Sequence, residues 1–93
     1  MKQTIASLTA TVLLATSAQA ACFADYKAKQ DNPLRLHYGV IELLEDCSLD
    51  GAALEISERI KQDGWTLLAV LDVFEENGLD ERRANAGEFY LRY

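Results

Sequence analysis

The chain has 93 residues, of which 49% are hydrophobic, and its 15 acidic and nine basic side chains give a formal net charge of −6 at pH 7. This acidic balance argues against binding to nucleic acid or to anionic membrane surfaces, because both select basic patches. The length allows one small domain, and the chain shows no internal repeat and no low-complexity tract.

Residues 1–20 have the layout of a secretory signal peptide. Lys2 provides a positive start, a short apolar run follows from Ile5 to Ala15, and Ala18-Gln19-Ala20 places small residues where a signal peptidase cleaves. The apolar run is shorter than the roughly 20 residues of a membrane span. We therefore expect cleavage after Ala20, export to the periplasm or the extracellular space, and one mature domain over residues 21–93.

The two cysteines, Cys22 and Cys47, are predicted to form a disulfide in that oxidising compartment. Such a bridge would add roughly 3–4 kcal/mol to a domain with a small core. It requires that the segment before Asp31 runs back along the first predicted strand. Lipidation of Cys22 is the alternative, but Gln19 occupies the position where a lipobox has an apolar residue.

The first half of the mature chain predicts two elements on either side of the Asp31-Asn32-Pro33 break. Residues 22–30 contain good helix formers and favour a short helix, although their alternation also suits a strand. Residues 34–44 predict a strand with Leu34, Leu36, Tyr38 and Val40 on one face and Arg35, His37 and Gly39 on the other.

The second half predicts a long helix and two further strands. Residues 48–64 predict a helix with the N-cap Asp50, or alternatively Ser48, and with Gly64 at its end. Its expected apolar stripe consists of Leu49, Ala53, Ile56 and Ile60. Residues 65–74 are apolar at both odd and even positions, which is typical of a strand covered on both faces or of a central strand. Periodicity alone also allows a buried helix, but the β-branched and aromatic content favours the strand. Residues 79–85 predict one helical turn or a loop, with Asp80-Glu81-Arg82-Arg83 solvated, and residues 88–93 predict a last strand.

Together these elements predict an α+β fold. We expect a small two-layer β-α-β-β domain, in which a three-stranded sheet carries one long helix on one face. The segment before Asp31 would form a short N-terminal helix or extension.

Two stretches carry a resemblance to known proteins. The run Gly64-Trp65-Thr66-Leu67-Leu68-Ala69-Val70, together with Phe89-Tyr90-Leu91-Arg92, resembles a Gly-Trp-Glu-Leu-Val-type family of small bacterial domains of unknown function, with Thr66 at a usually acidic position. Residues 24–39 are similar to those of short uncharacterised exported bacterial proteins. The resemblance implies the strand-helix-strand-strand fold and brings no activity or functional residues with it.

The sequence contains no arrangement that favours catalysis, a cofactor or a metal. His37 is the single histidine, the expected disulfide uses both cysteines, and no Gly-x-Ser-x-Gly or phosphate-binding glycine loop occurs. We therefore expect a non-enzymatic domain that binds an unknown protein partner. A glycan-binding module of the cell envelope is the alternative. The candidate binding surface consists of Tyr38, His37, Tyr90 and Arg92.

Mass spectrometry of the protein secreted by its host tests the expected processing. The first residue should be Ala21, and the mass should lie two hydrogens below that of the reduced chain, because Cys22 and Cys47 are joined. An acylated Cys22 would contradict both the disulfide and cleavage after Ala20.

Overall fold

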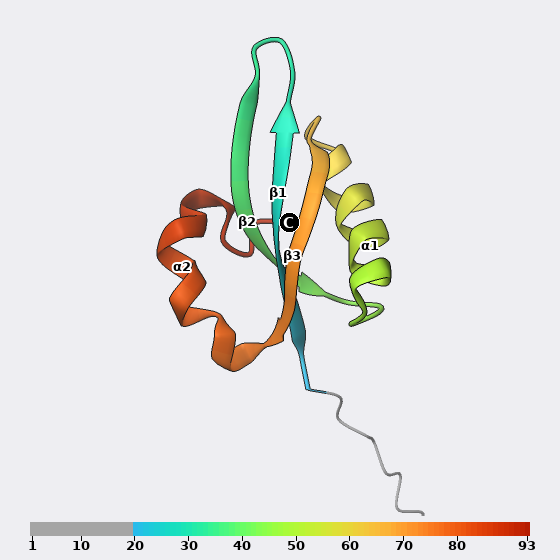
Figure 1. The fold of residues 1–93 in the computed structure, drawn as a ribbon, viewed down its shortest axis with the longest axis vertical. Coiled ribbons are helices and arrows are strands. Elements are labelled where there is room, and N and C mark those ends of the chain that lie inside the picture. The colour runs from blue at the N-terminus through green and yellow to red at the C-terminus, as the bar shows by residue number, and fades with distance from the viewer. Residues whose placement is uncertain (1–19) are drawn as a thin grey trace, which may run out of the picture.

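The computed structural model describes residues 20–93, so the expected signal peptide lies, except for Ala20, outside the described residues. The elements follow in the order β1 (Cys22–Gln30), β2 (Arg35–Leu43), α1 (Leu49–Lys61), β3 (Thr66–Glu75) and α2 (Asp80–Ala86), with short 3-10 turns at Glu76–Gly78 and Gly87–Phe89 (Figure 1). A three-stranded sheet with one long helix confirms the predicted α+β class.

The central strand of the sheet is β1. It pairs antiparallel with β2 on one side and with β3 on the other, so the strand order is β2-β1-β3. The favoured short helix over residues 22–30 is therefore wrong. The alternation of apolar residues along 22–30 outweighs their helix propensity, because in a strand every second residue packs into the core beside α1: Cys22, Ala24, Tyr26 and Ala28.

The predicted last strand, residues 88–93, is also wrong. Gly87–Phe89 is a 3-10 turn, and only Tyr90 forms an isolated parallel bridge to Val40 on the free edge of β2. Leu91 has a φ of +55°, which breaks the extended backbone that a ladder needs. The aromatic residues Phe89 and Tyr93 pack against the core instead. The order of strands and α-helices is thus β-β-α-β-α.

Helix α1 connects β2 to β3 across β1, since β2 and β3 run in the same direction. Its N-cap is Ser48, whose hydroxyl accepts a hydrogen bond from the Gly51 amide at 3.0 Å, rather than the preferred Asp50. Leu49 was expected to face the core but is 55% exposed. The buried side of the helix is formed by Ala52, Glu55, Ile56 and Ile60. The predicted Gly64 follows the helix with a φ of +82°.

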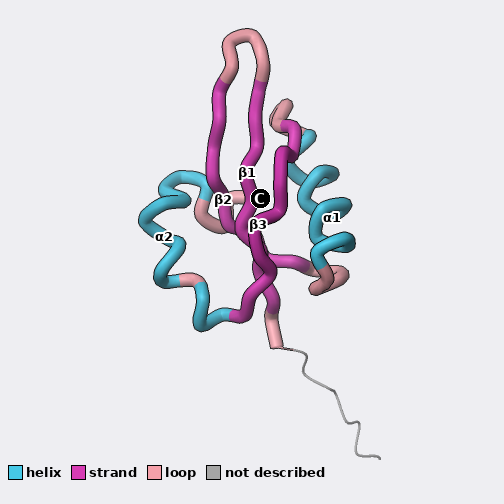
Figure 2. The backbone as a smooth tube through the Cα atoms, viewed as in Figure 1, coloured by secondary structure: helices cyan, strands magenta, loops and turns pink. Residues whose placement is uncertain are grey.

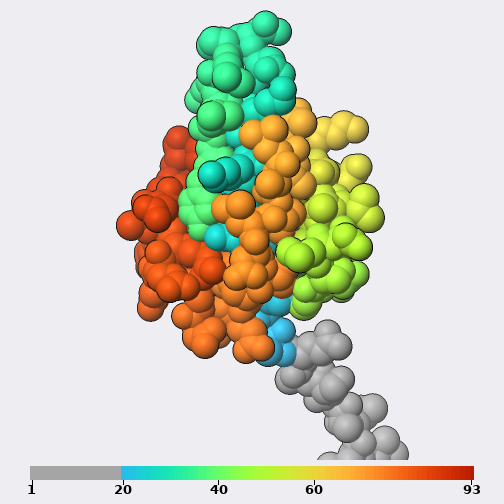
Figure 3. Space-filling view, viewed as in Figure 1, coloured from blue at the N-terminus to red at the C-terminus, as the bar shows by residue number. Residues whose placement is uncertain are grey.

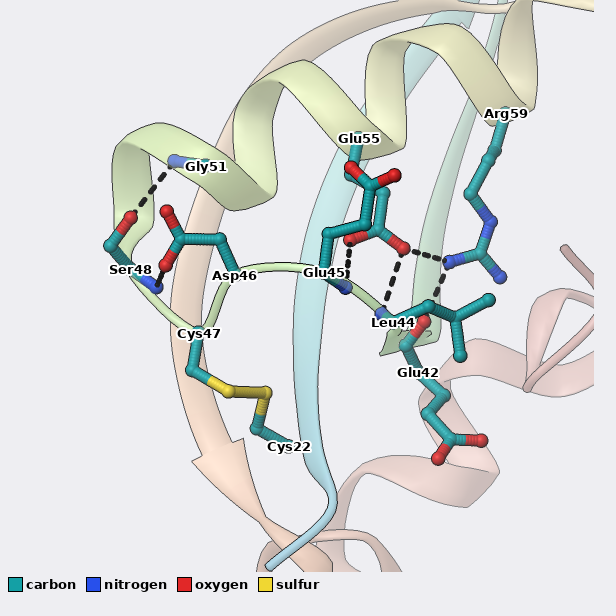
Figure 4. Close-up of a disulfide and its surroundings, with 10 residues drawn as sticks. All are labelled: Cys22, Glu42, Leu44, Glu45, Asp46, Cys47, Ser48, Gly51, Glu55 and Arg59. Atoms are coloured by element: carbon teal, nitrogen blue, oxygen red, sulfur yellow. Dashed lines mark hydrogen bonds and ion pairs between the residues drawn. A yellow bond between two sulfur atoms is a disulfide. The ribbon is translucent and has the colours of Figure 1, made fainter. Parts of the chain in front are cut away.

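The loop before α1 is held from two sides (Figure 4). The predicted disulfide joins Cys22 to Cys47, with the two Cα atoms 6.1 Å apart. The pairing of Cys22 with Leu43 provides the return path that this bridge requires. On the other side, the buried Glu55 carboxylate accepts the amide hydrogens of Leu44 at 2.9 Å and Glu45 at 3.1 Å.

Strand β3 lies at the edge of the sheet and is more exposed than predicted. Its register against β1 shifts twice, and the two extra residues, Leu68 and Leu71, have no partner in the ladder. They are 52% and 47% exposed. Coverage on both faces was therefore a wrong expectation, because the apolar residues fall partly at bulges.

The opposite side of the sheet from α1 carries α2 (Figure 2). The segment expected to be one turn or a loop forms this seven-residue helix. It covers only the half of the face near the start of β1, where Phe23 and Val40 are buried. The other half of this face has no helix over it in the described part of the chain.

The centre of the core contains a close contact between two paired residues of β1 and β2. Tyr26 is fully buried, and its ring lies directly over Gly39. A Cβ at Gly39 would lie 2.6 Å from the ring, nearer than two carbon atoms can approach without a shift. Gly39 is therefore required by the neighbouring side chain, as glycine often is inside a strand.

Gly39→Ala should lower the free energy of unfolding by about 1–3 kcal/mol, since the added methyl group overpacks the core. Chemical denaturation of the purified domain measures this loss. In a Tyr26→Leu background the same change should cost much less, because the shorter side chain leaves the space free. An equal loss in both backgrounds would show that the ring is not the cause.

Candidate functional site

The four residues of the predicted binding surface do not come together. His37 and Tyr38 are neighbours on β2, so their side chains lie on opposite faces of the sheet. Tyr90 lies at the free edge of β2, with the guanidinium of Arg83 5.3 Å from the centre of its ring. Arg92 is 49% exposed and lies beside Phe89.

His37 belongs to an aromatic cluster at one end of the core. Its ring stacks on Phe89 at 3.7 Å between centroids and meets Trp65 edge-on at 4.2 Å. Its Nε2 lies 3.0 Å from the hydroxyl of Tyr26, and the residue is only 8% exposed. These contacts give His37 a structural role, because solvent and substrate have little access to the ring.

The cluster keeps His37 neutral at pH 7. The pKa of His37 is lowered from 6.5 to about 4, mainly by burial and to a smaller extent by the nearby Arg92, while Glu88 opposes the shift. Burial also raises the pKa of the Tyr26 hydroxyl. A charged imidazole would therefore be disfavoured inside this cluster.

On the opposite face, Asp25 joins α2 to the sheet. Its Oδ2 accepts hydrogen bonds from the Tyr38 hydroxyl at 2.8 Å and from Arg82 Nε at 3.0 Å. The Arg82 guanidinium also lies 3.9 Å from the centre of the Phe74 ring. Arg82 was expected in a solvated loop, but its side chain is 18% exposed.

Burial and the hydrogen bond to Asp25 raise the pKa of Tyr38 to about 12. Tyr38 therefore remains a neutral hydroxyl, held in place by the carboxylate, and only its ring is available to a ligand.

Beyond this cluster, the uncovered half of the face contains a shallow groove of about 290 Å³. We call it the hairpin groove; it is lined by Lys27, Ala28, Leu36, His37, Tyr38 and Leu68. Leu36 is 66% exposed, and neighbouring Leu34 at the turn is 65% exposed. Figure 3 shows that this end of the β1–β2 hairpin extends beyond both helices.

Sequence reasoning placed Leu34, Leu36 and Tyr38 on one face and included Tyr38 in the candidate binding surface, but it did not identify the groove. The alternation correctly indicated one shared face, and it gave no information on how far α2 would extend over that face. Charge was the signal that could have indicated an exposed surface here. Lys27 and Lys29 alternate along β1 and pair with Tyr38 and Leu36 of β2, so these four side chains share one face.

The fold should lose stability as the pH falls from about 6.5 to about 4, because the unfolded chain binds a proton at His37 before the folded chain does. The shift in pKa corresponds to a loss of up to about 3 kcal/mol. Urea unfolding at several pH values measures it. The Tyr26→Phe/His37→Phe double variant is the control, since it keeps the carboxylates and removes the imidazole. An unchanged pH dependence in this variant would contradict the assignment to His37.

Over residues 20–93, no group of three or more His, Cys, Asp or Glu side chains is placed to hold a metal ion, and no helix is long and apolar enough to cross a membrane. The disulfide fits an oxidising environment. Comparisons with protein-family models, with curated proteins and with solved structures find no match to this chain.

Proposed function

We propose that this chain is an exported, non-enzymatic domain that binds a protein partner through the hairpin groove. The observation that carries the proposal is the uncovered apolar half of the sheet, where Leu36 and Leu68 are more than half exposed. A domain with a small core loses stability by leaving such side chains in water, and exposed apolar surface of this kind often marks an interaction site.

The charge around the groove supports a partner with carboxylates beside apolar side chains. Lys27 is exposed and lines the groove, and Lys29 follows it on the same face. The chain as a whole carries a formal charge of −6, so the basic residues are concentrated against the overall balance. Opposite charges around an apolar centre orient a partner and favour its approach.

Export remains part of this proposal and is supported by two features. Residues 1–20 have the composition of a signal peptide, and the cystine is the kind of bond that persists outside the cytoplasm. Membership in the Gly-Trp-Glu-Leu-Val-type family of unknown function is likewise proposed on residues 64–70 and 89–92.

A glycan-binding module of the envelope is the second candidate. The ring of Tyr38 lines the hairpin groove, and its hydroxyl is fixed by Asp25. A fixed aromatic ring offers the apolar face on which a sugar ring can stack. This candidate uses the same groove and differs in the chemistry of the occupant.

Photo-crosslinking in the host cell tests the proposal. A photoreactive amino acid at position 36 should give a discrete adduct with a protein. The same group at position 49 is the control: Leu49 is also exposed, but it lies outside the hairpin groove, so no discrete adduct should form there. Lys27→Glu should weaken the adduct at position 36 roughly tenfold, from the loss of charge complementarity. Lys61→Glu makes the same change in net charge on α1 and should have little effect.

Equal adducts at positions 36 and 49 would contradict a specific hairpin site. An adduct at position 36 that contains sugar and no peptide would favour the glycan candidate over the protein partner.

A further inference from the structure

A second exposed apolar groove lies on the other side of the molecule. We call it the helix groove; it is lined by Leu44, Glu45, Leu54, Glu58 and the paired Glu55 and Arg59. Leu44 and Leu54 are 71% and 74% exposed, and they are the two most exposed of the chain's large apolar residues in the described part. The groove is formed by α1 and the loop after β2, outside the sheet face that contains the hairpin groove.

The two grooves have opposite charge and similar apolar content. Glu45 and Glu58 are exposed beside the leucines of the helix groove. The Glu55 carboxylate adds no free charge there, because Arg59 Nη1 lies 2.7 Å from it. In the hairpin groove the corresponding exposed charge is Lys27, and Lys29 lies near it with a 3.4 Å ion pair to Asp31.

We infer that the hairpin groove of one copy of this chain binds the helix groove of a second copy. This inference rests on the proposed function, since it uses the same hairpin surface and specifies one occupant of it. Each groove presents two exposed leucines, and the leucines of one groove can pack against those of the other. The exposed Lys27 of the hairpin groove then faces the exposed Glu45 and Glu58 of the helix groove. The like charges within each groove oppose contacts between two identical grooves.

The contact joins two different surfaces, so each bound copy still exposes one free groove of each kind. Association of this kind continues from copy to copy and gives oligomers larger than a dimer. The grooves are small and the chains carry the same net charge, so we expect weak, transient association. The assembly therefore forms only at high local concentration.

Sedimentation equilibrium of the oxidised mature protein tests the inference. The weight-average mass should rise with concentration past that of a dimer. Lys27→Glu/Lys29→Glu and, separately, Glu45→Lys/Glu58→Lys should each weaken association at least roughly tenfold, because the facing charges become alike. Circular dichroism and thermal unfolding of each variant check that these exposed substitutions leave the fold intact.

An equimolar mixture of the two variants gives the decisive result. The acidic hairpin groove of the first variant faces the basic helix groove of the second, and the remaining two grooves are also complementary. The mixture should associate although neither variant does so alone. A mixture that stays monomeric would overturn the inference, as would wild-type protein that stays monomeric at millimolar concentration. A foreign protein crosslinked at position 36 in either case would leave the proposed function standing.

Discussion

The contact of the Tyr26 ring with Gly39 is the interaction on which the rest of this small core depends. Tyr26 is the largest of the fully buried side chains, and it lies on the central strand. Because the paired residue has no side chain, the ring can extend across β2 and reach His37. The aromatic cluster that follows fixes Trp65 at the start of β3 and Phe89 after α2. One glycine thus allows three distant segments to share a single core.

Helix α1, the disulfide, strand β2 and the closing Gly64 could be predicted from the sequence, because each depends on local periodicity or on a covalent rule. The secondary structure of residues 22–30 could not be predicted, since these residues suit a helix or a strand until their pairing partners on β2 and β3 are known. The inward position of Glu55 was also hidden, because its carboxylate is satisfied by two backbone amides and Arg59 rather than by solvent. The division of the candidate binding surface between the two sheet faces follows from the alternation along β2, which already placed His37 and Tyr38 on opposite faces. The exposure along each face could not be predicted, because it depends on where α2 ends, which no local pattern encodes.

The polar interactions of the fold are concentrated where they attach helices to the sheet. Asp25 binds Arg82 of α2 and the Tyr38 hydroxyl on one face, while Arg59 of α1 donates to the Glu42 carbonyl at 2.6 Å and to the backbone oxygen of Tyr93. Removing one member of such a partly buried pair costs more stability than removing one member of a surface ion pair, because the other group is left uncompensated. These contacts engage Arg59 and Arg82, so Lys27 and Lys29 are the basic residues on the uncovered half of the sheet face that carries α2. Because α2 covers only the other half of this face, the exposed leucines and the lysines of the hairpin groove are left side by side.

The position of β1 has a consequence for the order in which the chain can fold. The central strand is the first element of the domain along the chain, and both of its neighbours come later. Its hairpin with β2 needs only a short turn, whereas the pairing of Cys22 with Glu75 must wait for nearly the whole chain. Long-range pairing of this kind is slow because the ends of a long loop must first meet. Until then one edge of β1 stays open, and the cystine between Cys22 and Cys47, which needs only the first half of the chain, can hold that strand in place before the third strand has paired with it.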